Sequence, residues 1–190
     1  DSAATIEFTS GITTADNALN ASAILNSSDT ITFTDNSATG GVGTTYTLSN
    51  AKDIVSLGAD TDTVTVSVAA YLGTSDSLKG GSGTDTLSIT PTGGATISSA
   101  QLETASGFEV VNVVTGGAGN YKLTITDSFA ANNANSSDAL TVGRDTGAGG
   151  ADTGTTEIIA SDVSSTYGLT LTVDDGQDTD DKITGGAGDD

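Results

Sequence analysis

Aspartates recur at a nine-residue step in the segment 53–88. Asp53 and Asp62 are nine residues apart, and Asp76 and Asp85 repeat that spacing. An apolar residue follows each aspartate by two positions: Val55, Val64, Leu78 and Leu87. Carboxylate oxygens are ligands that hard cations such as Ca²⁺ prefer, and alternate side chains of a strand point to the same face. The spacing therefore predicts short strands joined by acidic turns that could bind a cation.

The last unit of this segment, residues 80–88, is the most regular. It reads GGSGTDTLS and matches the pattern G-G-x-G-x-D-x-U-x at every fixed position. Its glycines allow positive φ, so backbone carbonyl oxygens can converge on one point. The chain ends inside another copy, where Asp181 and Asp190 keep the nine-residue step. These units resemble the calcium-binding nonapeptide of the repeats-in-toxin (RTX) family.

The resemblance implies an all-β fold of parallel β-roll or β-solenoid segments with calcium in the turns, joined to further sandwich-like or solenoid regions. Two nonapeptides make one coil, so the turn before Asp62 should pair with the turn before Asp85. The turn before Asp53 should likewise pair with the turn before Asp76. The step from Asp62 to Asp76 is fourteen residues, which predicts that residues 69–73 bulge out as a loop.

The expected calcium ligands are the aspartates and the glycine backbone of these turns. The first block supplies Asp53, Gly58, Asp60, Asp62, Asp76, Gly80, Gly81, Gly83 and Asp85. The second block supplies Asp174, Asp178, Asp180, Asp181, Gly185, Gly186, Gly188 and Asp190. The turn before Asp53 contains no glycine, which makes its site the weakest. The alternative is a run of ordinary Asp/Gly turns that bind no metal.

The composition is strongly acidic. The net charge is -20, with 25 acidic and 5 basic residues and no His or Cys. This charge excludes a nucleic-acid role, because phosphate contacts need a basic surface, and it opposes compaction unless divalent cations neutralise it. Low hydrophobicity with high charge also describes disorder, but the alternating Thr, Val and Ile favour strands. Without His, Cys or Trp we expect no enzyme, although Asp/Glu pairs could in principle cleave glycosides.

The chain divides into four expected regions: an N-terminal β region (1–50), an RTX-like β-roll (51–90), a β-rich region with loops (91–173) and the start of a second calcium block (174–190). Strands are expected at 5–8, 29–34, 46–48, 87–90, 107–113, 121–126, 157–159 and 169–173. Weak helical spacing covers 17–26, and Ser98 with Gln101 forms a capping box for a one-turn helix. Residues 116–121 should form a hairpin turn without calcium, and 132–138 a polar loop. No apolar run is long enough to span a membrane, and the ends suggest a fragment of a longer protein.

A longer sequence pattern combines residues 80–87 with the stretch GFEVVNV at 107–113. It resembles bacterial surface-layer proteins and giant adhesins exported by type I secretion. The resemblance implies an extracellular, cell-surface protein that folds in calcium after export and self-associates into a lattice or filament. The alternatives are a repeat module of a large RTX adhesin and a non-catalytic part of a secreted RTX enzyme. Glu109 falls at a position matching this pattern, without an assigned role.

Overall fold

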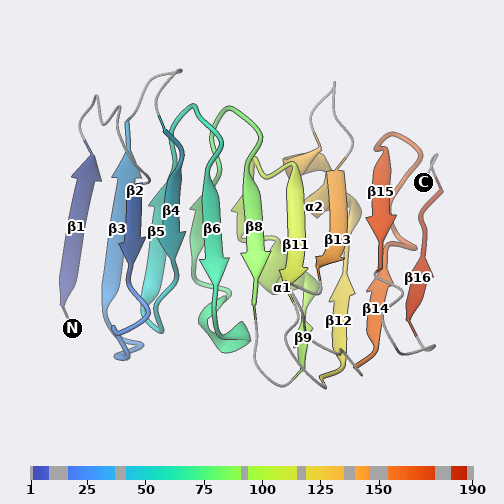
Figure 1. The fold of residues 1–190 in the computed structure, drawn as a ribbon, viewed down its shortest axis with the longest axis horizontal. Coiled ribbons are helices and arrows are strands. Elements are labelled where there is room, and N and C mark those ends of the chain that lie inside the picture. Colours follow the sequence, from blue (N-terminus) through green and yellow to red (C-terminus); the bar gives the residue numbers. More distant parts are fainter. Residues whose placement is uncertain are drawn as a thin grey trace.

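The computed structural model describes residues 2–8, 17–36, 42–90, 94–114, 119–134, 140–145, 154–173 and 181–187. Within these segments the chain is all-β and forms a β-solenoid (Figure 1). Neighbouring strands of the described chain pair in parallel, each strand stacking on the equivalent strand of the next coil. Parallel stacking explains the sequence, because each coil repeats the same alternation of inward and outward residues.

Three sheets make up the described part of the solenoid. Sheet A contains β1 (Ala3–Phe8), β3 (Thr30–Asp35), β5 (Lys52–Ser56), β7 (Ser77–Lys79) and β10 (Ala105–Ser106). Sheet B contains β2 (Asn17–Asn20), β4 (Thr44–Thr47), β6 (Thr63–Val66), β8 (Thr86–Ile89), β11 (Val110–Val114), β13 (Leu140–Asp145) and β15 (Leu169–Thr172). Sheet C contains β9 (Ala95–Ile97), β12 (Tyr121–Thr124), β14 (Thr156–Ile159) and β16 (Lys182–Thr184). In Figure 1 the strands of sheet B run opposite to those of sheets A and C.

The core lies between sheet B and the other two sheets. The apolar residues two positions after the repeated aspartates all point into it: Val55, Val64, Leu78 and Leu87 are at most 1% exposed. Phe33 stacks on Tyr46 with ring centroids 5.2 Å apart. Burial of these side chains, each contributing roughly 1.5–3 kcal/mol, confirms the inward role that the spacing predicted.

Sheet A ends and sheet C begins within one coil. That coil contains β9, then helix α1 (Ser99–Leu102), then β10. The predicted capping box is present, with Gln101 N–H donating to Ser98 Oγ. The Gln101 side-chain amide also donates to the Leu72 carbonyl at 2.6 Å. This bond holds α1 against the insertion at 69–73. As predicted, the insertion bulges out between the strands, and it contains a 3₁₀ turn, η1 (Ala69–Tyr71).

Three predictions about elements are wrong. Residues 17–20 form strand β2 rather than helix, because stacking on β4 supplies their hydrogen bonds and overrides weak helical spacing. The strands that flank 116–121 do not form the expected hairpin: β11 belongs to sheet B and β12 to sheet C, and the two do not pair. Residues 132–133 end a helix, α2 (Asp127–Asn133), rather than start a polar loop. The glycines at 116 and 117 lie outside the described residues.

In the described chain, no helix has the length and apolar character needed to cross a membrane.

Candidate cation site at one edge of the solenoid

Carboxylates cap the starts of the sheet B strands. Each accepts a hydrogen bond from the backbone N–H of the aligned residue in the preceding coil. Thr44 N–H donates to Asp62 Oδ1 at 2.6 Å, and Asp62 N–H donates to Asp85 Oδ1 at 2.8 Å. Asp85 N–H in turn donates to Glu109 Oε2 at 2.9 Å. The three carboxylates thus form a column, here called the carboxylate column (Asp62, Asp85 and Glu109).

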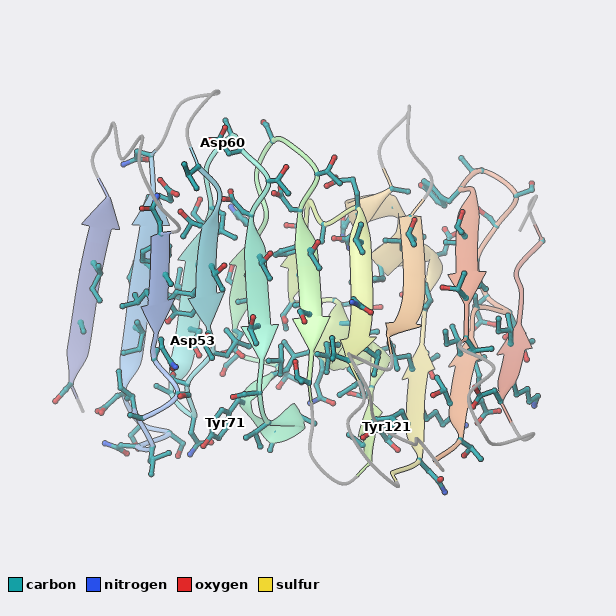
Figure 2. The ribbon with its side chains drawn as sticks, in the orientation of Figure 1. Asp53, Asp60, Tyr71 and Tyr121 are labelled. Atoms are coloured by element: carbon teal, nitrogen blue, oxygen red, sulfur yellow. The ribbon has the colours of Figure 1, made fainter. Side chains whose placement is uncertain are left out.

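The same device recurs at the opposite edge, where the strands of sheets A and C begin. Asp53 N–H donates to Asp76 Oδ1 at 3.0 Å, and Thr156 N–H donates to Asp181 Oδ1 at 2.7 Å. Figure 2 places Asp53 at this edge and Asp60 at the edge of the carboxylate column. A carboxylate is a strong acceptor for an N–H that must otherwise remain unpaired at a strand start. This capping explains the periodic aspartates without reference to any ion.

Burial of these carboxylates disfavours their ionised form. Asp85 is fully buried, and burial raises its pKa to about 7, a shift that the neighbouring charges of Asp62 and Glu109 increase. Burial also raises the pKa of Asp76 to about 6, and Asp53 adds to that shift. Near neutral pH such groups need either a proton or a compensating cation.

The second carboxylate oxygen of Asp85 has no hydrogen-bond donor among the described residues. This oxygen, Oδ2, is buried. A Cβ added to Gly80 would lie 2.9 Å from this oxygen and 1.9 Å from the Gly107 carbonyl oxygen. A carboxylate oxygen and a carbonyl oxygen therefore border the same small space, which only a glycine leaves open. Two oxygens facing one another without a donor repel, so this space favours a cation or a proton.

Backbone carbonyl oxygens of the preceding coil also approach this glycine turn. Gly81 has φ +110° and Gly83 has φ +143°, conformations that glycine adopts readily. A Cβ on Gly81 would lie 2.1 Å from the Gly58 carbonyl oxygen, and a Cβ on Gly83 would lie 2.1 Å from that of Asp60. Calcium takes oxygen ligands of this mixed carboxylate and carbonyl kind. The Asp85 turn therefore combines carboxylate and carbonyl oxygens of the kind that calcium binds.

Hydrogen bonds from the chain itself occupy both oxygens of Asp53. Asp53 Oδ1 accepts the Tyr46 hydroxyl at 2.6 Å, and Oδ2 accepts Ser49 N–H at 3.1 Å. The Ser49 hydroxyl lies within hydrogen-bonding distance of both oxygens. Burial and Asp53 together raise the pKa of Tyr46, so the phenol remains a donor. These hydrogen bonds, in a turn without glycine, give Asp53 a structural role that requires no metal.

Of the other predicted ligands, some accept backbone hydrogen bonds and others lie outside the described residues. Asp62 Oδ2 accepts Gly58 N–H at 3.1 Å, and Asp76 Oδ2 accepts Gly73 N–H at 2.8 Å. In the second block, Gly185 follows β16 and Gly186 packs against the Val163 carbonyl. The remaining predicted ligands lie outside the described residues: Asp174, Asp178, Asp180, Gly188 and Asp190. In the described part of the chain, no three His, Cys, Asp or Glu side chains gather in a group able to hold a metal. An ion at Asp85 would thus depend mainly on backbone oxygens.

Two members of this edge had no role in the sequence analysis. Glu109 continues the column one coil beyond Asp85, at a separation of 24 residues against 23 between Asp62 and Asp85. That near-equal spacing was the available signal, but Glu in place of Asp and the missing nonapeptide obscured it. Asp35 accepts a hydrogen bond from the Thr44 hydroxyl beside the start of β4, and no repeat precedes it.

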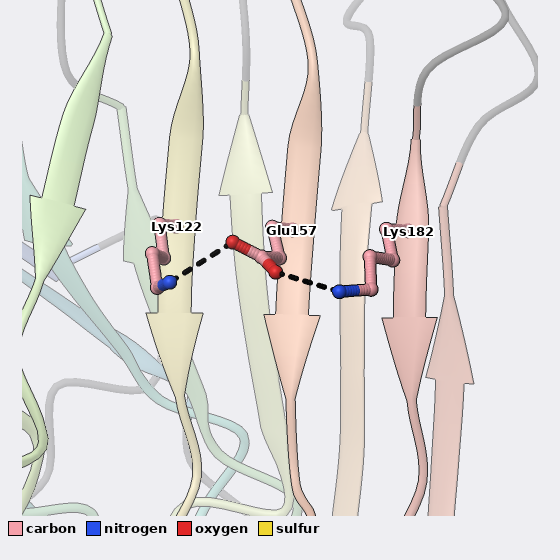
Figure 3. A network of polar contacts seen from close by, with 3 residues as sticks. All are labelled: Lys122, Glu157 and Lys182. Carbon is pink, nitrogen blue, oxygen red and sulfur yellow. Dashed lines mark hydrogen bonds and ion pairs between the residues drawn. The ribbon is translucent and has the colours of Figure 1, made fainter.

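A separate charged row crosses the outer face of sheet C. Lys122, Glu157 and Lys182 are aligned in register on β12, β14 and β16. Glu157 pairs with Lys122 at 3.0 Å and with Lys182 at 3.2 Å (Figure 3). Both lysines lower the pKa of Glu157. The row is largely solvent-exposed, and ion pairs of this kind contribute little to stability.

Comparison of the chain with protein-family models, with curated proteins and with solved structures finds no match in any of the three.

Proposed function

We propose that this chain is an extracellular structural protein, stabilised by calcium, that forms or belongs to a bacterial surface layer or surface filament. The observation that carries the proposal is the uncompensated Asp85 oxygen beside glycine-exposed carbonyls, in a chain of net charge -20. The RTX-like nonapeptide at 80–88 supports the same interpretation. A solenoid without His or Cys also fits a structural role better than catalysis.

Calcium would act as a folding switch in this proposal. Asp85 and the carbonyl groups of the neighbouring turns would hold the ion, which when bound offsets the buried negative charge. At low calcium, repulsion among the carboxylates opposes folding. At outside concentrations of roughly 10⁻³ M, sites of about 10⁻⁴–10⁻³ M affinity fill and add their binding free energy to folding. The chain would therefore fold after export rather than before it.

A calcium titration followed by circular dichroism tests the switch. The chelated protein should show less β signal or a lower unfolding temperature, and calcium should restore both. Magnesium should do much less, because it is smaller and demands octahedral geometry. Equal stabilisation by both ions would instead indicate simple screening of charge and would remove the support for a specific site.

Electron microscopy of the purified chain with calcium tests the surface role. A repetitive lattice or ribbon that disappears in chelator is the expected result. A monodisperse monomer that binds a glycan or a cell surface would favour the adhesin module instead. Fusion of the chain to a catalytic region in its parent protein would favour the third alternative, a non-catalytic part of a secreted enzyme.

A further inference from the structure

Sheet B presents an outer face with a regular pattern of hydroxyl groups. Inward residues of its strands are buried, apart from the partly buried Leu19 and Leu171 on the two end strands, and alternate residues point outward and are partly or fully exposed. The strand register aligns these outward residues in two rows across seven strands. One row is Ala18, Thr45, Thr63, Thr86, Val110, Thr141 and Thr170; the other is Asn20, Thr47, Thr65, Ser88, Asn112, Gly143 and Thr172. These two rows are here called the hydroxyl face.

The hydroxyl face is uncharged in a protein of net charge -20. No Asp, Glu, Lys or Arg occurs in the strands of sheet B before the last two residues of β13. The outward positions of sheets A and C, in contrast, carry Lys52, Lys79, Lys122, Glu157 and Lys182. Charged side chains therefore lie mainly on one side of the solenoid. The frequent occurrence of threonine in strands would explain the hydroxyl groups but not this uneven distribution of charge.

The parallel stacking gives the hydroxyl face a two-dimensional repeat. Neighbouring strands lie about 4.7–4.9 Å apart, and outward residues along one strand lie roughly 6.6–6.8 Å apart. The block Thr45/Thr47, Thr63/Thr65 and Thr86/Ser88 fills this grid without a gap. Gly143 interrupts it, but the Thr172 hydroxyl would lie only 2.6 Å from a Cβ at that position and so covers the space.

A second copy of the chain is a poor occupant for this face. Seven strands by about four residues give an area on the order of 450 Å². Two such faces together bury less than the roughly 1,200 Å² of a stable interface. The described outward residues include no aromatic or Arg anchor of the kind that dominates protein interfaces.

We propose that the hydroxyl face binds crystalline water, that is, the surface of ice. Ice is uncharged and periodic, and its repeat distances are close to those of the strand grid. Each threonine hydroxyl can donate and accept a hydrogen bond with lattice water, while its methyl group favours an ordered first water layer. Charged groups would hold competing hydration shells, and this face lacks them. The inference needs only the folded chain and does not depend on the proposed calcium switch.

Ice recrystallisation in the presence of the full chain tests the proposal, with Thr65→Tyr and Thr32→Tyr as matched variants. Thr65 is central in the hydroxyl face, whereas Thr32 is an equally half-buried outward residue of β3 on the other side. The wild type and Thr32→Tyr should inhibit recrystallisation, and Thr65→Tyr should lose that activity. Circular dichroism in calcium confirms that each variant is folded, and adsorption of labelled wild type to a single ice crystal gives a second readout independent of any variant.

Four results would overturn the proposal. They are a folded wild type that neither adsorbs to ice nor inhibits its recrystallisation, retention of activity by Thr65→Tyr, equal loss of activity in both variants, and a wild-type dimer that Thr65→Tyr abolishes without any effect of the wild type on ice. The last result would assign the face to a second copy of the chain.

Discussion

At the scale of single residues, the repeated aspartates accept hydrogen bonds from backbone N–H groups, and this role requires no ion. Asp62, Asp76 and Asp181 each accept a backbone N–H from the preceding coil. Asp85 differs because one of its oxygens caps Asp62 while the other, buried, accepts nothing among the described residues. This asymmetry distinguishes Asp85 from Asp62 and Asp76, whose second oxygens accept the N–H groups of Gly58 and Gly73.

Replacement of the Asp85 carboxylate should show how much its buried charge lowers the stability of the folded chain. Asp85→Asn keeps the acceptor for Asp62 N–H, removes the buried charge and adds an N–H donor. We expect the variant to be more stable than the wild type by about 1–3 kcal/mol in chelator at pH 8, and to gain less from calcium. Chemical denaturation in chelator and in calcium measures both effects. Asp162→Asn is the control, because Asp162 is exposed, and it should change neither.

Stability in chelator should fall as the pH rises from 5 to 8. The pKa of Asp76 is raised to about 6 and that of Asp85 to about 7 in the folded state, whereas both titrate near 4 when unfolded. The folded chain therefore binds more protons in this window, and its stability is lost as these groups ionise. Urea unfolding at several pH values measures the slope. A slope that persists unchanged in Asp85→Asn would exclude this residue as the upper titrating group.

At the scale of elements, the glycine turns permit the coils to stack closely. Gly83→Ala would combine a φ of +143° with a Cβ 2.1 Å from the Asp60 carbonyl oxygen. We expect a loss of about 1–3 kcal/mol from backbone strain alone. Gly73→Ala is the matched control, since its Cβ would meet atoms no closer than 3.6 Å, and its effect should stay within about 1 kcal/mol. Denaturant unfolding in calcium compares the two, and similar losses would contradict the account of the turn.

Helix α2 is fixed to the coil that ends sheet A by one buried side chain. Asn133 accepts Phe108 N–H at 3.0 Å and donates to the Ala105 carbonyl at 3.2 Å. Asn133→Ala leaves both groups unpaired and should lower stability by about 1–3 kcal/mol. Asn132→Ala changes an exposed neighbour and should be near neutral. If thermal unfolding gave the two variants equal midpoints, α2 would not secure this coil.

The sequence predicts what the repeat controls and misses what depends on distant coils. The inward apolar residues are confirmed, because they follow from a local period. The pairing of Asp53 with Asp76 and of Asp62 with Asp85, which the resemblance to a coiled nonapeptide repeat implied, is also confirmed. The transfer from sheet A to sheet C, helix α2 and strand β2 were not predicted, since stacking partners far along the chain decide them. For the same reason the role of Glu109 becomes evident only once β11 lies beside β8.

At the scale of the whole molecule, the solenoid separates its chemistry by side. Carboxylates lie at the edges, most described strand charges lie on sheets A and C, and sheet B presents uncharged hydroxyl groups. The proposed calcium switch belongs to the edges, and the proposed ice-binding surface belongs to sheet B. The two can therefore be altered independently, by Asp85→Asn and by Thr65→Tyr.

A crystal structure grown with ample calcium, with anomalous diffraction to identify the ion, tests the central claim most directly. The account predicts a calcium ion bonded to Asp85 Oδ2 and to carbonyl oxygens of the adjoining glycine turns. Density showing that space without an ion, with the Asp85 carboxyl group protonated and donating to a carbonyl oxygen, would contradict it.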